Sequence, residues 1–185
     1  MTSRRRGDRS RFWSVVGAVV AADVASKAVA VATLAPIGLE RPVLGDWLRW
    51  KLVYNPGAAF GLHLGAWSRP VFILLSLVAL GILWRVYAGA RAGDRARVLA
   101  VALVGGGAIG NLLDRLRASQ GVVDFIDVGI GSARWPTFNV ADIAVSCGAI
   151  LLAWVLWTEE EAASEPAGAP AGGRAEPAAN VVNTP

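Results

Sequence analysis

The sequence predicts an all-α integral membrane protein: a four-transmembrane-helix bundle with a small β-rich extracytoplasmic cradle. Hydrophobic residues make up 55% of the 185 residues, charged residues only 17%, and the mean hydropathy is +0.48. A chain this apolar is not an ordinary soluble domain. Four apolar runs come close to the roughly 20 residues that cross a bilayer, and we expect spans at about residues 12–34, 70–87, 98–113 and 138–157.

The first apolar run follows a basic segment, residues 1–11, that carries five arginines. Such a pattern is also typical of a signal peptide, but this run contains Asp23 and Lys27, where a signal core carries no charge. We therefore expect an uncleaved span. The acid precedes the base by four residues, which is the favourable order for an ion pair on one helical face. The pair could serve to let two charges persist near the membrane. It could also position groups at a site, and the two roles are compatible.

Residues 35–68 form the longest predicted external connection. Its glycines and prolines disfavour a long helix. Within it, Asp46–Tyr54 (DWLRWKLVY) partly alternates apolar and polar residues, as a half-buried strand does, and its aromatic residues suit the headgroup level of a membrane. We expect a strand-rich cap that lies on the membrane and ends in a turn at Asn55-Pro56-Gly57.

The remaining segments are simpler. The second half of the third run contains Gly105, Gly106, Gly107 and Gly110, and small residues let helix backbones approach closely in lipid. Residues 158–185 are polar and rich in Ala, Pro, Gly and Glu, which predicts a disordered cytoplasmic tail. The membrane domain is therefore expected at 12–157.

The distribution of basic residues predicts the orientation. Residues 1–11 and the loop 85–97 are dense in arginine, and cytoplasmic segments carry an excess of Lys and Arg. Four spans place both termini on one side, so we expect both in the cytoplasm and the two longer connections outside. The same clustering accounts for the net charge of +4 and the pI near 10 without a nucleic-acid partner.

The stretch from Gly105 to Asp142 organises the chain, because most ionisable and amide side chains at the ends of apolar segments lie in it. Asn111 and Arg115 share a face of the third span, and Asn139 and Asp142 share a face of the fourth. Carboxylates at such positions indicate a function. Nine polar residues are expected near the outer membrane–water boundary: Asp23, Lys27, Asn55, Asn111, Asp114, Arg115, Asp124, Asn139 and Asp142.

Several of these residues also have a purely structural interpretation. Asn139 could cap the fourth span with Asp142 in its first turn, where the helix dipole favours an acid. A local ion pair with Arg115 or Arg117 is the preferred reading of Asp114, and Asp127 is expected to be a solvated loop acid. Asp124 is different, because it lies in the apolar run Val122–Ile126, where burial would raise its pKa.

Asp124 and Asp142 together suggest the pair of carboxyl groups of an aspartic protease. An ionised carboxylate takes a proton from water, while a protonated one donates to the carbonyl oxygen or the leaving nitrogen. This chemistry requires no metal or other cofactor. His63 is the only histidine and Cys147 the only cysteine, which gives little support to histidine metal chemistry, a Ser-His-Asp triad or a cysteine metal cluster.

At these residues the chain resembles the lipoprotein signal peptidases (signal peptidase II). The resemblance extends from Asp23 to Asp142, and five motifs in order make it specific, with Ser26 in place of the usual Thr as a mild departure. The motifs are Asp23-Val24-Ala25-Ser26-Lys27, Asn55-Pro56-Gly57-Ala58-Ala59-Phe60-Gly61, Gly106-Gly107-Ala108-Ile109-Gly110-Asn111-Leu112-Leu113-Asp114-Arg115-Leu116, Val122-Val123-Asp124-Phe125 and Phe138-Asn139-Val140-Ala141-Asp142.

The resemblance implies a membrane aspartic endopeptidase of the bacterial cell membrane, and we expect the protein to be a monomer. Such an enzyme cuts the signal peptide from a prolipoprotein just before a cysteine that carries diacylglycerol, with membrane lipid as its surroundings and no nucleic acid or metal. Asp124 and Asp142 would be the catalytic pair. The residues that orient the substrate and the pair would be Asp23, Lys27, Asn55, Asn111, Arg115 and Asn139.

Other functions predict other patterns. A small proton or ion transporter needs polar residues through the full depth of the bundle, whereas the second run has almost none and the inner half of the fourth is apolar. A non-enzymatic scaffold would use the polar residues to hold helices together, so conservative Asp-to-Asn changes would affect stability and no reaction. Metal-dependent hydrolysis through Asp124, Asp127 and Asp142 is a more distant alternative.

Overall fold

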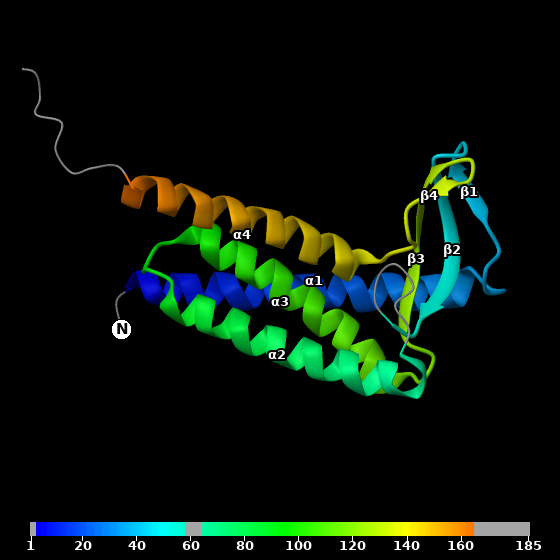
Figure 1. Ribbon diagram of the computed structural model, residues 1–185, viewed down its shortest axis with the longest axis horizontal. Coiled ribbons are helices and arrows are strands. Elements are labelled where there is room, and N and C mark those ends of the chain that lie inside the picture. Colours follow the sequence, from blue (N-terminus) through cyan, green and yellow to red (C-terminus); the bar gives the residue numbers. More distant parts are fainter. Residues whose placement is uncertain (1–2, 58–63, 165–185) are drawn as a thin grey trace, which may run out of the picture.

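The computed structural model describes residues 3–57 and 64–164. Four long helices form an elongated bundle, and a small twisted sheet crosses one end of it (Figure 1). The first and last described residues lie at the opposite end. The expected tail beyond Ser164 and residues 58–63, which include the last four residues of the second motif, lie outside the described part of the chain.

Within the described residues, four helices are long and apolar enough to cross a membrane. This confirms the predicted fold class. The helices are α1 (Ser3–Thr33), α2 (Ser68–Gly89, preceded by the short 3-10 helix η2 at Gly65–Trp67), α3 (Arg95–Arg117) and α4 (Val140–Ser164).

α2 and α3 extend a few residues beyond the predicted spans, and α1 and α4 extend further, each toward its own terminus of the chain. α1 begins at Ser3, so residues 3–11 of the expected basic tail are helical. α4 continues past Trp157 to Ser164, into the segment expected to be disordered. Extending an existing helix adds a hydrogen bond for each residue without a new nucleation step, and Ala and Glu, which follow Trp157, are good helix formers.

α3 is the central helix, because α1, α2 and α4 all pack against it. Its glycines allow this. A Cβ atom on Gly107 would lie 2.3 Å from the carbonyl oxygen of Ala141 in α4, and one on Gly106 would lie 2.9 Å from Cβ of Val19 in α1. The predicted close approach of backbones at this glycine-rich segment is thus confirmed for both neighbouring helices.

The sheet contains strands β1 (Arg41–Leu44), β2 (Leu48–Asn55), β3 (Val122–Ile130) and β4 (Ala133–Arg134). They lie in this order, and neighbours are antiparallel. The strand-rich cap was predicted from residues 35–68 alone. β3, which comes from the connection between α3 and α4, was missed because its first residues are buried on both faces and do not alternate in polarity.

The two faces of the sheet have different partners. Leu52, Val123 and Phe125 form an apolar cluster with Ala30 and Leu34 at the end of α1. This cluster holds the sheet against the bundle. Successive side chains point to opposite faces of a strand, so the residues between these ones are directed away from the cluster.

The segment between β4 and α4 is attached to β3 by backbone hydrogen bonds. The amides of Phe125 and Ile126 donate to the carbonyl oxygen of Phe138 at 3.0 and 2.8 Å, and the Phe138 amide donates to Ile126 at 3.0 Å. These bonds bring the start of α4, with Asn139, beside Asp124 on β3.

We predict that Gly107→Ala destabilises the protein. The new methyl group would lie within 2.8 Å of a Val145 side-chain carbon as well as against the Ala141 carbonyl, so α3 and α4 must separate. Overpacking of this kind costs about 1–3 kcal/mol, and thermal unfolding in detergent should show a lower Tm.

Gly105→Ala, in the same helix, is the matched control. A Cβ atom there meets nothing within 4 Å, and alanine favours the helix more than glycine does, so the Tm should stay equal or rise. Equal losses of Tm in the two variants would contradict the packing argument.

Candidate active site

Asp124 is a buried carboxyl group with two amide donors. Only 3% of the surface of Asp124 is exposed. Asp124 pairs with Val53 across β2 and β3, and Asn55 lies two residues further along the same face of β2. Asn55 Nδ2 donates to Asp124 Oδ2 at 3.1 Å, and Asn139 Nδ2 donates to Oδ1 at 2.7 Å.

Burial, together with the smaller effect of the negative charge of Asp142, raises the pKa of Asp124 from its ordinary value of 3.8 to about 7. The hydrogen bonds from Asn55 and Asn139 oppose this shift without cancelling it. The expected effect of the apolar run around Asp124 is confirmed.

Asp142 lies in the first turn of α4. Its backbone amide donates to Asn139 Oδ1 at 3.0 Å, and its Oδ2 accepts from the backbone amide of Asn139 at 3.1 Å. This reciprocal arrangement caps the helix, as the structural interpretation predicted. Asp142 Oδ1 remains available beyond the cap and accepts from Asn111 Nδ2 at 2.8 Å.

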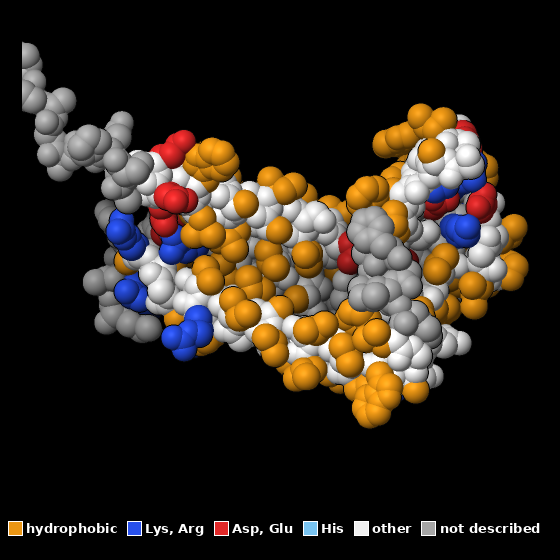
Figure 2. All heavy atoms as spheres, in the orientation of Figure 1, with side chains coloured by type: hydrophobic (Ala, Val, Ile, Leu, Met, Phe, Trp, Pro, Cys, Tyr) orange, Lys and Arg blue, Asp and Glu red, His pale blue; other side chains and the backbone are white. Residues whose placement is uncertain are grey.

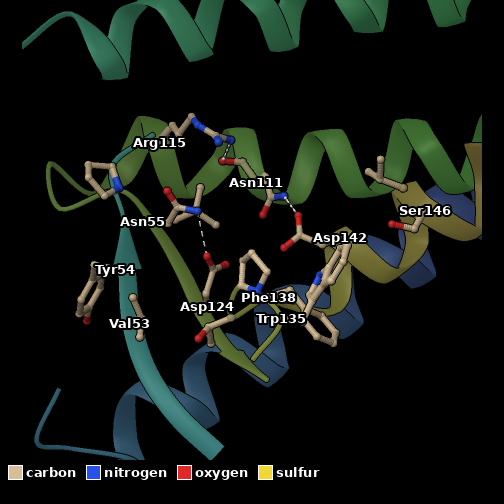
Figure 3. Close-up of a pocket in the computed structure, with 15 residues that line it drawn as sticks. Val53, Tyr54, Asn55, Asn111, Arg115, Asp124, Trp135, Phe138, Asp142 and Ser146 are labelled. Carbon is tan, nitrogen blue, oxygen red and sulfur yellow. Dashed lines mark hydrogen bonds between the residues drawn. The ribbon is translucent and has the colours of Figure 1, made fainter. Parts of the chain in front are cut away.

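Asn139 connects the two carboxyl groups. Its side chain donates to Asp124, and its backbone donates to Asp142. The Asn139 side chain is fully buried, so the connection is fixed in position. Figure 3 shows Asp124 extending from β3 and Asp142 from α4 toward the region between them, with dashed lines to Asn55 and Asn111.

Lys27 determines the orientation of the Asn111 amide by binding its oxygen atom. Lys27 Nζ donates to Asn111 Oδ1 at 2.9 Å, and Asn139 Nδ2 also donates to this oxygen at 3.1 Å. Because an amide oxygen only accepts, these two donors leave Nδ2 of Asn111 to face the carboxylate of Asp142.

Lys27 itself lies between two acids. Its ammonium group is 2.8 Å from Asp23 Oδ2 and 2.8 Å from Asp114 Oδ2, and Lys27 is 4% exposed. The ion pair predicted between Asp23 and Lys27 is therefore confirmed. Asp23 also accepts from the Ala141 backbone amide at 3.0 Å, which ties α1 to the first turn of α4.

Two acids differ from the sequence-based expectation. Asp114 does not form the expected local pair with Arg115 or Arg117. It faces α1, where it binds Lys27, and it accepts from the Val123 amide at 3.1 Å. Asp127 is 3% exposed, with Arg134 Nε donating to it at 3.0 Å. The hairpin of β3 and β4 buries Asp127. From the sequence we expect a loop at Asp127, so this burial is not predicted.

Arg115 reaches the turn that follows β2. Its Nη1 donates to the Asn111 carbonyl at 3.2 Å, its Nη2 donates to the Gly57 carbonyl at 3.2 Å, and its guanidinium lies 5.6 Å from the centre of the Phe72 ring. This side chain joins α2, α3 and the turn after Asn55. The two predicted catalytic residues and the six predicted orienting residues thus lie in one region.

A cavity of about 480 Å³ lies between the bundle and the sheet, and five of the predicted site residues line it: Asn55, Asn111, Arg115, Asp124 and Asp142. In Figure 2 the molecule is hollowed between the helices and the tip of the sheet, and hydrophobic side chains border this hollow. Trp135, Thr137, Val145 and Ser146 also line the cavity. Sequence reasoning missed them, since none carries a charge or a motif of its own.

The fold and this site define a class of protein: a four-helix membrane protein with two carboxyl groups joined by amides on one cavity wall. Comparison with known proteins gives the particular family. The sequence profile of the signal peptidase (SPase) II family matches residues 15–158. The chain belongs to this family, a family of proteases.

Curated relatives and solved structures agree. A lipoprotein signal peptidase of Polynucleobacter necessarius subsp. necessarius (strain STIR1) is 39% identical over 147 residues, which cover 78% of this chain and 87% of the relative. One of Rhodococcus jostii (strain RHA1) is 43% identical over 156 residues, covering 78% and 71%. A bacterial membrane enzyme solved by the in meso method at 2.3 Å superposes with a TM-score of 0.73 at 30% identity, covering 85% of this chain and 93% of the other.

We predict that protonation of Asp124 stabilises the folded protein. The folded state keeps this proton up to pH about 7, whereas the unfolded chain releases it near the ordinary value of 3.8. The contribution is complete below pH 4 and is lost as the pH rises through 7, by at most about 1.4 kcal/mol per pH unit. Thermal unfolding measured from pH 4 to 8 should show the loss.

Asp124→Asn removes the titrating group and keeps the shape. The decline in Tm between pH 5 and 7 should be shallower in this variant than in the wild type. Parallel pH profiles for the two proteins would mean that Asp124 carries no raised pKa.

Proposed function

We propose that this chain cleaves the signal peptide from prolipoproteins immediately before a diacylglyceryl-modified cysteine. One observation carries the proposal: Asn139 contacts both Asp124 and Asp142, and these two carboxyl groups line one cavity at the end of a membrane bundle. Membership of the signal peptidase II family supports the reaction, and the names of the relatives support the substrate class.

In this mechanism Asp124 holds the proton and Asp142 is the base. The raised pKa of Asp124 keeps at least half of these carboxyl groups protonated up to a pH of about 7. Asp142 takes a proton from water as the water oxygen attacks the scissile carbonyl carbon, while Asp124 donates its proton to the carbonyl oxygen. The C–N bond then breaks, the leaving nitrogen receives the proton from Asp142, and Asp124 recovers its own from the carbonyl side.

The other polar residues hold this pair in position. Asn55 and Asn139 orient Asp124, and Asn111 orients Asp142. Lys27, compensated by Asp23, fixes the amide of Asn111. Arg115 holds the turn after Asn55 through the Gly57 carbonyl. A site positioned by side chains from four elements of the fold is preorganised, so little reorganisation is needed at the moment of reaction.

The surroundings suit a substrate that arrives from lipid. The cavity lies where the helices meet the sheet, and Trp135, Phe138 and Val145 give its wall apolar surface. We place the peptidase domain at 12–157 in the bacterial cell membrane as a monomer, with both termini cytoplasmic and the sheet and cavity outside. The arginine-rich segment 1–11 supports this orientation.

We predict that Asp124→Asn and Asp142→Asn each reduce cleavage of a diacylglyceryl-modified prolipoprotein in detergent by at least about 10³-fold, because each removes a proton donor or acceptor of the pair. EDTA should have no effect on the wild type, and a substrate with an unmodified cysteine should be cut poorly.

Asp127→Asn is the matched control, since Asp127 is an equally buried acid three residues along β3 that pairs with Arg134. It should lower the Tm and retain cleavage. Full activity in either of the other two variants would exclude the proposed pair, and loss of stability without any cleavage by the wild type would favour a scaffold.

We further predict that Asn55→Ala extends activity to higher pH while lowering its maximum. The Asn55 hydrogen bond lowers the pKa of Asp124, so its removal raises that pKa and Asp124 stays protonated to higher pH. The measurement is the alkaline limb of kcat/KM against pH, which should move upward from about 7.

Pro56→Ala is the control for this change. Pro56 lines the same cavity and makes no hydrogen bond to Asp124 among the contacts of the described residues. Its alkaline limb should match the wild type. A limb that moves to lower pH in Asn55→Ala would contradict the role assigned to this amide.

A further inference from the structure

A second cavity lies at the opposite end of the bundle from the sheet. It has a volume of about 300 Å³, and it is lined by α1, the end of α2, the turn after α2 and Val98 of α3. Three arginines contribute to its wall: Arg5 and Arg9 from α1 and Arg91 from the turn. Figure 2 shows blue Lys and Arg side chains gathered at this end, with hydrophobic side chains along the sides of the bundle.

The charges of these three arginines are not compensated within the described part of the chain, where none of them forms an ion pair. Asp8 also lines the cavity, but it is already engaged: its Oδ2 accepts from the Gly93 amide at 2.7 Å, and its Oδ1 lies 4.0 Å from Arg11. Nearby Arg97 is paired with Asp94 and Glu159 and does not line the cavity. The cavity therefore presents net positive charge.

An apolar groove continues from this cavity along the bundle. Trp13 and Trp84 line both, and the groove of about 200 Å³ adds Val16, Leu80 and Ile109 among others. The groove exists because α1 and α2 each pack against α3, and the stacked rings of Phe12 and Tyr87, 4.2 Å apart, join α1 to α2 at the end nearer the arginines.

We propose that the cavity and the groove together bind one anionic phospholipid. The phosphate group lies among Arg5, Arg9 and Arg91, because guanidinium groups bind phosphate through paired N–H donors. An acyl chain lies in the groove. From Arg5 to Val16, α1 rises about 16 Å, which matches one leaflet of a hydrocarbon core about 30 Å thick, and tryptophans such as Trp13 and Trp84 favour the boundary between headgroup and chain.

The test is native mass spectrometry of the full chain in detergent, titrated with phosphatidylglycerol or with phosphatidylcholine of the same acyl chains. The wild type should retain one phosphatidylglycerol in preference to phosphatidylcholine. The triple variant Arg5→Gln/Arg9→Gln/Arg91→Gln should weaken this binding by roughly tenfold or more, given the attraction that each arginine contributes at a membrane surface.

The matched control is Arg6→Gln/Arg85→Gln/Arg95→Gln. It removes the same charge from the same end of the bundle, and none of these three residues lines the cavity. It should bind as the wild type does. Equal weakening in both triple variants, or equal retention of the two lipids by the wild type, would overturn the site in favour of diffuse electrostatic attraction.

Gly105→Leu tests the groove without changing the charge. Gly105 lines the groove, and a Cβ atom built on it meets nothing within 4 Å, so a leucine side chain there starts without a clash and extends into the groove. It should weaken phosphatidylglycerol binding while the Tm and the cleavage of prolipoprotein in detergent are retained. Unchanged binding would exclude an acyl chain in the groove.

Discussion

The ammonium group of Lys27 is the interaction on which the rest of the site depends. A buried charge is tolerated only when it is paired and hydrogen-bonded, and Lys27 meets that condition by binding Asp23, Asp114 and Asn111 together. These partners come from α1 and α3, so one cation bridges the two helices. Through Asn111 and Asn139 the same contacts extend to Asp142 and Asp124.

Close packing of backbones makes this arrangement possible. A Cβ atom on Gly110 would lie 2.5 Å from the carboxylate of Asp23, so glycine there leaves the space that the acid occupies. Gly107 similarly lets the first turn of α4 approach α3. The glycines that allow helix packing are therefore the residues that allow the polar groups to meet, and the stability of the bundle and the geometry of the site share one cause.

The two ends of the bundle differ in chemistry. At the sheet end, burial and the nearby charge of Asp142 raise the pKa of Asp124, and hydrogen bonds from amides hold both carboxyl groups in position. At the other end, arginines remain exposed beside tryptophans and an apolar groove. The first arrangement suits proton transfer in a water-poor site, and the second suits contact with a charged lipid surface.

Much of this protein could be predicted from its sequence, because hydropathy and short motifs are local signals. Four apolar runs determined the bundle, and the apolar neighbours of Asp124 determined its raised pKa. Tertiary structure alone decided the rest. β3 completes the sheet through pairing with a strand about 70 residues away, Asp114 turns to Lys27 instead of a neighbouring arginine, and Asp127 becomes buried against Arg134. Each of these three features depends on contacts between residues that are far apart in the sequence. A buried charge pairs with the partner that the fold places beside it.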